Sequence, residues 1–255
     1  MIDNFSLYFE YITSLLNQNQ GVLDLAIFFV SIIIGWISGI FSSLIKRPKL
    51  KIDLIDGPTF VCTFGTGKIF NGMKEHRTAV ALYLRIINAG SAPTDILNIS
   101  IGYHWHISIL APVLWFKYRI FWFYLTNQTI SIEDFQSKIG ENIKIYPYLV
   151  QRSILENNKV DTYILPGMAI NGIVYFEQSA SFGGCFPSRR SGYCKVRIRI
   201  TDSYGRRHSR TAFIPSVSLE QARTFNPSFG KTLSELHGDH TPVEIEVDSS
   251  GNVKK

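Results

Sequence analysis

The chain has 255 residues and a formal net charge of +6 at pH 7. With 45% hydrophobic and only 18% charged residues, it is too apolar to be an intrinsically disordered protein. Its three cysteines, Cys62, Cys185 and Cys194, are odd in number and show no CxxC spacing, which argues against a disulfide framework and against a cysteine-based zinc site.

The first predicted element is a transmembrane helix over residues 22–45. The run VLDLAIFFVSIIIGWISGIFSSLI carries one charge, Asp24, and at 1.5 Å per residue it would extend about 36 Å, enough to span a bilayer with some tilt. A cleaved signal peptide is the alternative. No basic residue precedes the run, however, and KRPK follows it where small residues should mark a cleavage site. We therefore expect the helix to remain in the mature protein.

The flanks of this helix predict its orientation. Residues 1–21 contain no Lys or Arg, whereas a basic linker, residues 46–50, and Lys51 follow the helix. Basic flanks are retained in the cytoplasm. The prediction is a single-pass protein of the inner (cytoplasmic) membrane, with a short extracytoplasmic segment that is either amphipathic or frayed, and with the remainder facing the cytoplasm.

Small residues recur at every fourth position of the predicted helix: Ser31, Gly35, Gly39 and Ser43. On a continuous helix they would line one face and let a second helix approach closely, since packing drives helix association in lipid. The pattern predicts self-association or a protein partner in the membrane. Gly and Ser are also common in membrane helices that have no such partner.

After Lys51 the pattern changes to short runs of alternating β-branched and aromatic residues separated by Gly, Pro and Asn, which predicts strands. The turn Asp202-Ser-Tyr-Gly205 should join the last two as a hairpin. SVSLEQARTF then predicts a short helix with Ser218 as its N-cap, and residues 216–255 otherwise form a polar tail. The predicted strands are 51–56, 59–64, 78–88, 95–104, 143–150, 161–165, 170–177, 193–202 and 207–214.

Three of these stretches carry a resemblance to a known fold. LRIINAGSAPTDILNISI, LPGMAINGIVYFE and VRIRITDSYGRRH have a strand, Gly-Pro turn and strand rhythm that resembles immunoglobulin-like domains of the CARDB and fibronectin type. The resemblance covers most of residues 51–215 and implies an antiparallel β-sandwich of a kind often used for binding and assembly. It implies no catalytic residue, because a fold alone does not define a function.

An insertion at residues 107–142 interrupts the predicted sandwich. Its first part, ISILAPVLWFKYRIFWFYL, is apolar and aromatic enough to suggest a second span, but Lys117 and Arg119 would each cost about 2.5–3.5 kcal/mol at a bilayer centre. We therefore expect this part to lie at the membrane interface, with packing onto the domain or a partner as the alternative. The predicted interface residues are Trp115, Lys117, Arg119, Phe121 and Trp122.

A basic patch is predicted near the last two strands. In KVRIRI the basic residues alternate with apolar ones, so three of them share one strand face. Such a face would contact anionic lipid, nucleic acid or an acidic partner, or would simply be solvated. Anionic lipid is favoured because the anchor brings the membrane close, and nucleic acid is disfavoured by the modest net charge. The patch comprises Arg189, Arg190, Lys195, Arg197, Arg199, Arg206, Arg207 and Arg210.

Signs of catalysis are sparse. His104 and His106 would share a strand face, and His237 and His240 have a ligand-like spacing, but no HExxH, cysteine pair or phosphate-binding loop accompanies them. Two hypotheses follow. The first is a non-enzymatic, membrane-anchored interaction or scaffold module, an accessory subunit of a bacterial membrane complex that needs no cofactor. The alternative is a metal-dependent hydrolase that uses His104 and His106.

Overall fold

The computed structural model describes residues 13–14, 18–39, 46–107, 111–129, 131–149, 162–231 and 243–244. It divides into two compact units, Met1–Arg47 and Pro48–Lys255, which we describe separately.

The first unit contains the helix α2 (Gln20–Ile37). Its 18 residues extend about 27 Å, and among the described residues it is the one helix long and apolar enough to cross a membrane, a criterion that a signal sequence also meets. Ser38 and Gly39 follow it in a turn, and Gly39 has a left-handed φ of 75°. The described helix thus begins before the predicted range 22–45 and ends at Ile37, while residues 40–45 lie outside the described residues.

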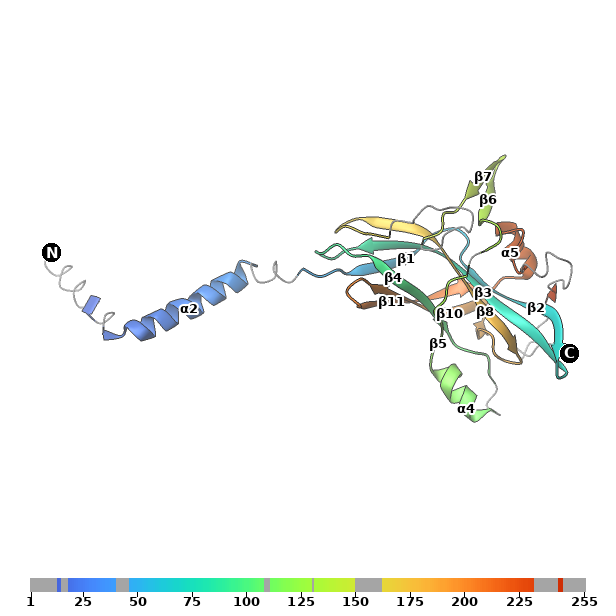
Figure 1. Ribbon diagram of the computed structural model, residues 1–255, viewed down its shortest axis with the longest axis horizontal. Coiled ribbons are helices and arrows are strands. Elements are labelled where there is room, and N and C mark those ends of the chain that lie inside the picture. The colour runs from blue at the N-terminus through green and yellow to red at the C-terminus, as the bar shows by residue number, and fades with distance from the viewer. Residues whose placement is uncertain are drawn as a thin grey trace. The chain divides into compact units, whose positions relative to one another are not determined.

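The second unit contains two five-stranded sheets in which neighbouring strands run antiparallel (Figure 1). In the first sheet, β1 and β2 pair with successive parts of one edge of β3, and β8 pairs along its other edge. In the second sheet the order is β11-β10-β4-β5, with β9 on the end of β10. The first sheet consists of β1 (Leu50–Leu54), β2 (Phe60–Phe70), β3 (Met73–Asn88), β8 (Ala169–Phe182) and β12 (Val243–Glu244). The second consists of β4 (Ile96–Tyr103), β5 (Phe123–Leu125), β9 (Arg189–Arg190), β10 (Tyr193–Asp202) and β11 (Arg207–Pro215).

One apolar core lies between the two sheets. Leu82, Leu84 and Phe176 of the first sheet and Ile101 and Ile198 of the second belong to the same cluster, and each is completely buried. Two antiparallel sheets that share a core in this way are compatible with a β-sandwich. The predicted mainly β, antiparallel class is confirmed.

The other face of the first sheet is covered as well. α5 (Leu219–Phe225) packs there through Leu219 and Ala222, together with Phe229 and Phe135, onto Phe60 and neighbouring residues of β2 and β8. The helix begins as predicted, because the Ser218 hydroxyl accepts a hydrogen bond from the Gln221 backbone N–H (3.1 Å) and the Gln221 side-chain oxygen accepts one from the Ser218 backbone N–H (3.2 Å).

The predicted turn between the last strands is also confirmed. β10 and β11 pair from Tyr193↔Pro215 to Thr201↔Arg207, and the Asp202 carboxylate accepts hydrogen bonds from the backbone N–H groups of Tyr204 (3.0 Å) and Arg206 (2.9 Å). The strands predicted at 59–64 and 78–88 are longer than expected and form the β2–β3 hairpin, whose register shifts between Gly65 and Ile69. Of the predicted strand 161–165, Ile164 makes an isolated bridge to Thr94, and residues 150–161 lie outside the described residues.

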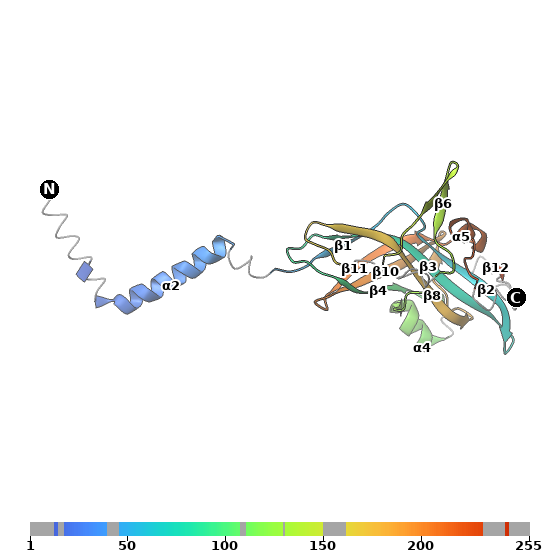
Figure 2. The same cartoon turned by 45° about the horizontal axis from the view of Figure 1, so that its top comes forward.

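The connection between β4 and β8 carries two further elements. A short helix pair, α4 (Pro112–Trp115) and the π-helix η1 (Phe116–Ile120), projects from one side of the domain, and the hairpin of β6 (Gln136–Ile139) and β7 (Asn142–Ile145) projects from the opposite side (Figures 1 and 2). The predicted strand 143–150 is therefore only the end of this hairpin, followed by a single bridge at Tyr148.

Candidate functional site

The aromatic insertion leaves the second sheet at the end of β4 and returns as β5. Gly102 pairs with Tyr124 and Tyr103 with Phe123, so the end of the insertion forms an edge strand of the sheet. Trp105 closes the base of the loop: its backbone N–H donates to the Tyr118 carbonyl (2.8 Å), and its ring centre lies 4.2 Å from that of Tyr118. These contacts fix α4 and η1 at the end of the sheet.

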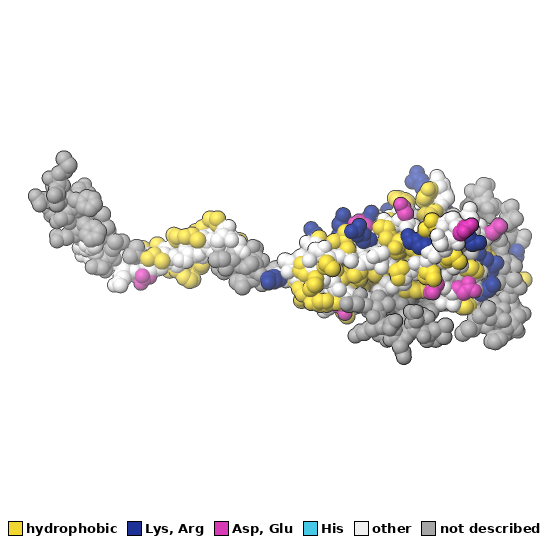
Figure 3. Space-filling model, turned by 90° about the horizontal axis from the view of Figure 1, so that it is seen from above, with side chains coloured by type: hydrophobic (Ala, Val, Ile, Leu, Met, Phe, Trp, Pro, Cys, Tyr) yellow, Lys and Arg dark blue, Asp and Glu magenta, His cyan; other side chains and the backbone are white. Residues whose placement is uncertain are grey.

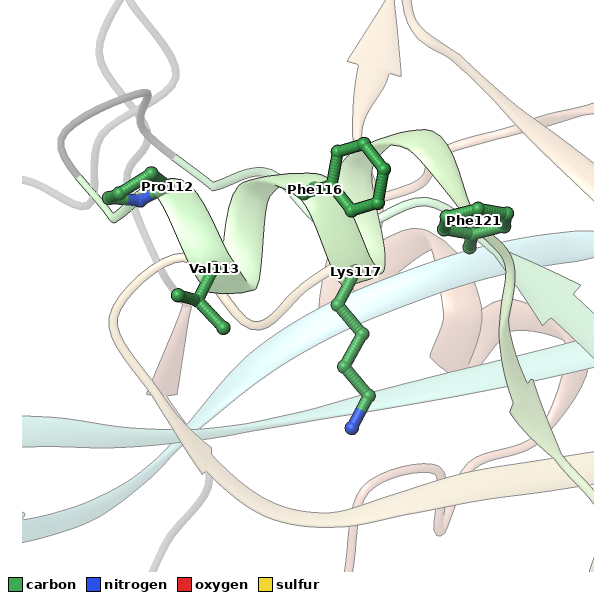
Figure 4. A pocket seen from close by; sticks show the side chains of 5 residues that line it. All are labelled: Pro112, Val113, Phe116, Lys117 and Phe121. Carbon is green, nitrogen blue, oxygen red and sulfur yellow. The ribbon is translucent and has the colours of Figure 1, made fainter.

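The projecting helices expose apolar side chains. Val113 is 76% exposed, Phe116 57% and Phe121 56%, and together with Pro112 and Lys117 they line an open hollow of about 610 Å³ (Figure 4). Val113 and Lys117 point to the same side of the helix in this view. The "α4–η1 tip", residues 112–121, thus combines an apolar surface with the ammonium group of Lys117. At a membrane interface, apolar side chains lie among the acyl chains while a lysine extends its charge toward the phosphates.

Aromatic residues of the returning strand meet the basic residues of β10. Arg199 Cζ lies 4.1 Å from the centre of the Tyr124 ring, and its guanidinium also donates to the Tyr124 hydroxyl (2.8 Å). Lys195 Nζ and Arg197 Cζ each lie 5.8 Å from the centre of the Trp122 ring. These are cation–π contacts, and they join the insertion to the strand that carries the predicted basic patch.

The alternation of β10 directs these cations outward. Val196, Ile198 and Ile200 are buried in the core between the sheets, so Lys195, Arg197 and Arg199 lie on the opposite face of the strand. Trp122 and Tyr124 contact them on that face. We call this set of five side chains the "aromatic–cationic surface": Trp122, Tyr124, Lys195, Arg197 and Arg199.

Gly102 makes this arrangement possible. β4 lies between β5 and β10, and Gly102 is paired with Tyr124 on one side and with Arg197 on the other. A Cβ atom at residue 102 would lie only 2.7 Å from Cε1 of Tyr124. Because glycine has no side chain there, the Tyr124 ring lies across β4 and reaches Arg199.

His104 adds an aromatic ring to the surface. Its ring centre lies 4.2 Å from that of Trp122, and Nδ1 is 3.1 Å from the Phe121 carbonyl oxygen. Burial lowers the pKa of His104, and the charges of Lys195 and Arg119 lower it further against the opposing effect of the Phe121 carbonyl. The ring therefore contributes packing rather than charge at neutral pH.

The structure separates the members of the predicted basic patch. Arg189 and Arg190 in β9 are exposed beside the start of β10, and Arg206 and Arg207 are exposed near its end. Arg210 does not belong to this face: its guanidinium contacts the Asp53 carboxylate and the Ile52 carbonyl, and so links the two sheets.

The predicted interface residues also differ in their surroundings. Phe121 and Lys117 are exposed at the tip, Arg119 contacts the Ser188 hydroxyl, and Trp115 and Trp122 are half-buried. Sequence reasoning missed Val113 and Phe116, the most exposed apolar side chains of the tip, although their three-residue spacing is a helical signal. It also missed Gly102 and Tyr124, whose roles depend on strand register.

In the first unit, the predicted small-residue face is not continuous. Ser31 and Gly35 lie within α2, where the Ser31 hydroxyl donates to the Ile27 carbonyl (2.7 Å). Gly39 lies beyond the last helical residue in a left-handed conformation, so it does not share their face, and Ser43 lies outside the described residues.

The predicted histidine pair has separate surroundings. His104 packs on Trp122, whereas the His106 ring stacks on Phe186 with 5.3 Å between ring centres. Within the described part of the chain, no three His, Cys, Asp or Glu side chains are grouped as they would be around a metal ion. His237 and His240 lie outside that part.

The comparisons with known proteins add no assignment to this geometry. No protein-family model and no curated protein matches the chain.

Proposed function

We propose that this protein is a membrane-anchored, non-enzymatic interaction module whose β domain binds the anionic surface of the membrane that holds its anchor. In this proposal residues 22–45 span the inner membrane, and the domain is an immunoglobulin-like sandwich of the CARDB or fibronectin type in the cytoplasm. The α4–η1 tip enters the interface, and the aromatic–cationic surface faces the lipid headgroups.

The observation that supports this proposal is that two features from distant parts of the sequence occupy one surface. The apolar tip continues into Trp122 and Tyr124, which lie on Lys195, Arg197 and Arg199. Aromatic rings favour the headgroup region, and each basic residue near anionic lipid contributes about 1 kcal/mol. On the side from which the β6–β7 hairpin projects, by contrast, Lys and Arg mingle with Asp and Glu (Figure 3).

The anchor strengthens these surface contacts. A tethered domain encounters the bilayer at a high effective concentration, so a surface that already binds vesicles from solution is more fully occupied once the helix is inserted. The anchor also gives the module a route to partners in the membrane, through self-association or through a subunit of a larger complex.

Vesicle flotation of a fragment spanning residues 48–255 tests the proposal, with a melting curve to show that the fragment is folded. We expect it to float with vesicles of phosphatidylcholine and phosphatidylglycerol and to be released by high salt. The variant Val113→Ser/Phe116→Ser should lose flotation without a change in melting temperature, since both side chains are exposed.

A matched control is available on the opposite side of the domain. Ile143 and Ile145 of β7 are 58% and 60% exposed, so Ile143→Ser/Ile145→Ser removes similar apolar area. This variant should float like the parent. A folded parent fragment that stays in the soluble fraction at low salt would overturn the proposed function.

A further inference from the structure

The tip of the β2–β3 hairpin is a second exposed apolar feature. Asn71 and Gly72 form its turn, with positive φ values of 50° and 77°, a conformation that suits two-residue hairpins. On either side of the turn, Ile69 is 68% exposed, Phe70 60% and Met73 50%. Three large apolar side chains thus surround a turn that projects from the sheet.

The apolar tip is flanked by lysines. Lys68 precedes Ile69, and Lys74 pairs directly with Ile69 across the hairpin; both lysines are exposed. Glu75, the nearest acidic residue of the hairpin, pairs with Phe182 farther from the turn. Apolar residues at the end of a projection with lysines behind them match a membrane interface, where acyl chains lie deeper than phosphates.

This tip lies on the same side of the domain as the α4–η1 tip. In Figures 1 and 2 the β2–β3 hairpin slopes to the lower right and α4 projects downward, whereas the β6–β7 hairpin projects upward.

The segment from Phe182 to Ser188 connects the two tips. Phe182 packs on Phe70 with 6.0 Å between ring centres, and Ser188 contacts Arg119 of η1. Between these residues, the Phe186 carbonyl accepts a hydrogen bond from the His106 N–H (2.8 Å). The contacts tie both tips to one connecting segment.

We infer that residues 68–74, the tip of the β2–β3 hairpin, form a second membrane-inserting element that enters the same anionic bilayer surface as the α4–η1 tip. This inference rests on the proposed function and adds a site to it. Two insertion points separated along the domain fix its orientation on the bilayer, which a single point of contact would leave free to rotate.

The test uses the full chain reconstituted in vesicles of phosphatidylcholine and phosphatidylglycerol. Cys62 and Cys194 are buried, so Cys185→Ser removes the more accessible native thiol, and labelling of this background measures any residual reaction. Spin labels are then placed singly through Phe70→Cys, Phe116→Cys and Ile143→Cys. Each label is exposed to oxygen, which concentrates in lipid, and to a nickel complex, which stays in water.

We expect labels at residues 70 and 116 to shift toward oxygen collision and away from nickel collision, and the label at residue 143 to remain nickel-accessible. If residue 116 shifts and residue 70 behaves like residue 143, the hairpin inference is wrong and the proposed function stands. If neither shifts, both are wrong. A residue 70 label shielded from both reagents indicates a protein contact and also overturns the inference.

Charge reversal provides a second readout in the same system. The pair Lys68→Glu/Lys74→Glu should return the residue 70 label to nickel accessibility in anionic vesicles and should leave the residue 116 label in place. Persistent lipid exposure of residue 70 in this variant would contradict the assigned role of the two lysines.

Discussion

At the scale of single residues, the absence of a side chain at Gly102 determines whether Tyr124 reaches Arg199. A Gly to Ala change in an extended strand ordinarily stabilises a protein by about 0.4–1 kcal/mol, because it reduces the freedom of the unfolded chain. At residue 102 the added Cβ meets the Tyr124 ring at 2.7 Å, so the ring must move and release Arg199. We therefore expect Gly102→Ala to destabilise the domain by about 1–2 kcal/mol in urea denaturation.

A double variant separates this contact from other effects of alanine. In Gly102→Ala/Tyr124→Ala the clash is gone, so the cost of the Gly102 change should disappear when it is measured in the Tyr124→Ala background. Tyr124→Phe keeps the ring and removes the hydroxyl that accepts from Arg199, so it isolates the 2.8 Å hydrogen bond. Gly102→Ala that is as stable as the parent would contradict the role assigned to this glycine.

His76 gives the domain a pH dependence of known sign. It is 2% exposed, with Nδ1 2.7 Å from the Ser181 carbonyl oxygen, and burial lowers its pKa from 6.5 to about 4, against a smaller opposing effect of Glu75. Because the folded pKa is lower, the folded state binds fewer protons than the unfolded state as pH falls from 6.5 toward 4. Burial of the neutral His76 ring is therefore fully compatible with the folded state above pH 6.5, and the domain loses stability as the pH falls from 6.5 toward 4.

Comparison with His76→Gln isolates this effect. Between pH 7 and pH 5 the parent should lose about 2 kcal/mol more unfolding free energy than the variant, whatever the absolute stability of the variant at pH 7. Urea denaturation at the two pH values measures the difference. Equal losses in the two proteins would show that His76 titrates in the folded state with an ordinary pKa.

At the scale of elements, the sequence predicted those features that depend on neighbouring residues: strand alternation, a hairpin turn and a helix cap. The alternation in KVRIRI placed three cations on one face of β10, the Asp202 turn joined β10 to β11, and Ser218 capped α5. Each depends on residues within a few positions of one another. The same reasoning wrongly assigned Arg210 to the basic patch. Arg210 pairs with the core-facing Ile198, so its side chain lies on the face of β11 that is turned toward the first sheet, where it contacts Asp53.

Features that depend on pairing between distant strands were not predictable. Trp122 meets Lys195, and Tyr124 meets Arg199, only because β4 lies between β5 and β10 in a particular register, and a shift of one residue would reverse every side chain. The β2–β3 hairpin has a recognisable Asn-Gly turn, but glycines at 65 and 67 interrupt its alternation. Its strand conformation near Glu75 and His76 is stabilised by pairing with β8, which lies far away in sequence.

The end of α2 changes the prediction for helix association. Gly35 lies within the helix, so Gly35→Leu should separate two associated helices and lower dimerisation in an in-membrane association assay. Gly39 has φ 75°, a conformation that leucine adopts only with strain, so Gly39→Leu should mainly disturb the helix end. Ile33→Leu is the control: it also places a leucine in α2 but hardly changes the side-chain volume, so association should be unchanged. Unchanged association in Gly35→Leu would show that Ser31 and Gly35 do not form an interface.

At the scale of the whole molecule, the proposed function requires a particular topology. Lys46, Arg47, Lys49 and Lys51 follow the proposed anchor helix, and residues 1–21 contain no basic residue, so the β domain should be retained in the cytoplasm. The cytoplasmic leaflet carries the anionic lipids that the aromatic–cationic surface would bind. Orientation and surface charge therefore make the same prediction about where the domain lies.

Cysteine labelling of intact cells tests this topology. In the Cys185→Ser background, one cysteine is placed at Asn4, and in a second variant one is placed at Arg206, which is exposed in the β10–β11 turn. A membrane-impermeant maleimide should label residue 4 in intact cells and residue 206 only after the membrane is permeabilised. Labelling of residue 206 alone in intact cells would invert the topology and place the aromatic–cationic surface outside the cytoplasm. Loss of the residue 4 cysteine from the mature chain would instead identify residues 22–45 as a cleaved signal sequence, which would remove the anchor, place the domain outside the cytoplasm and contradict the proposed function.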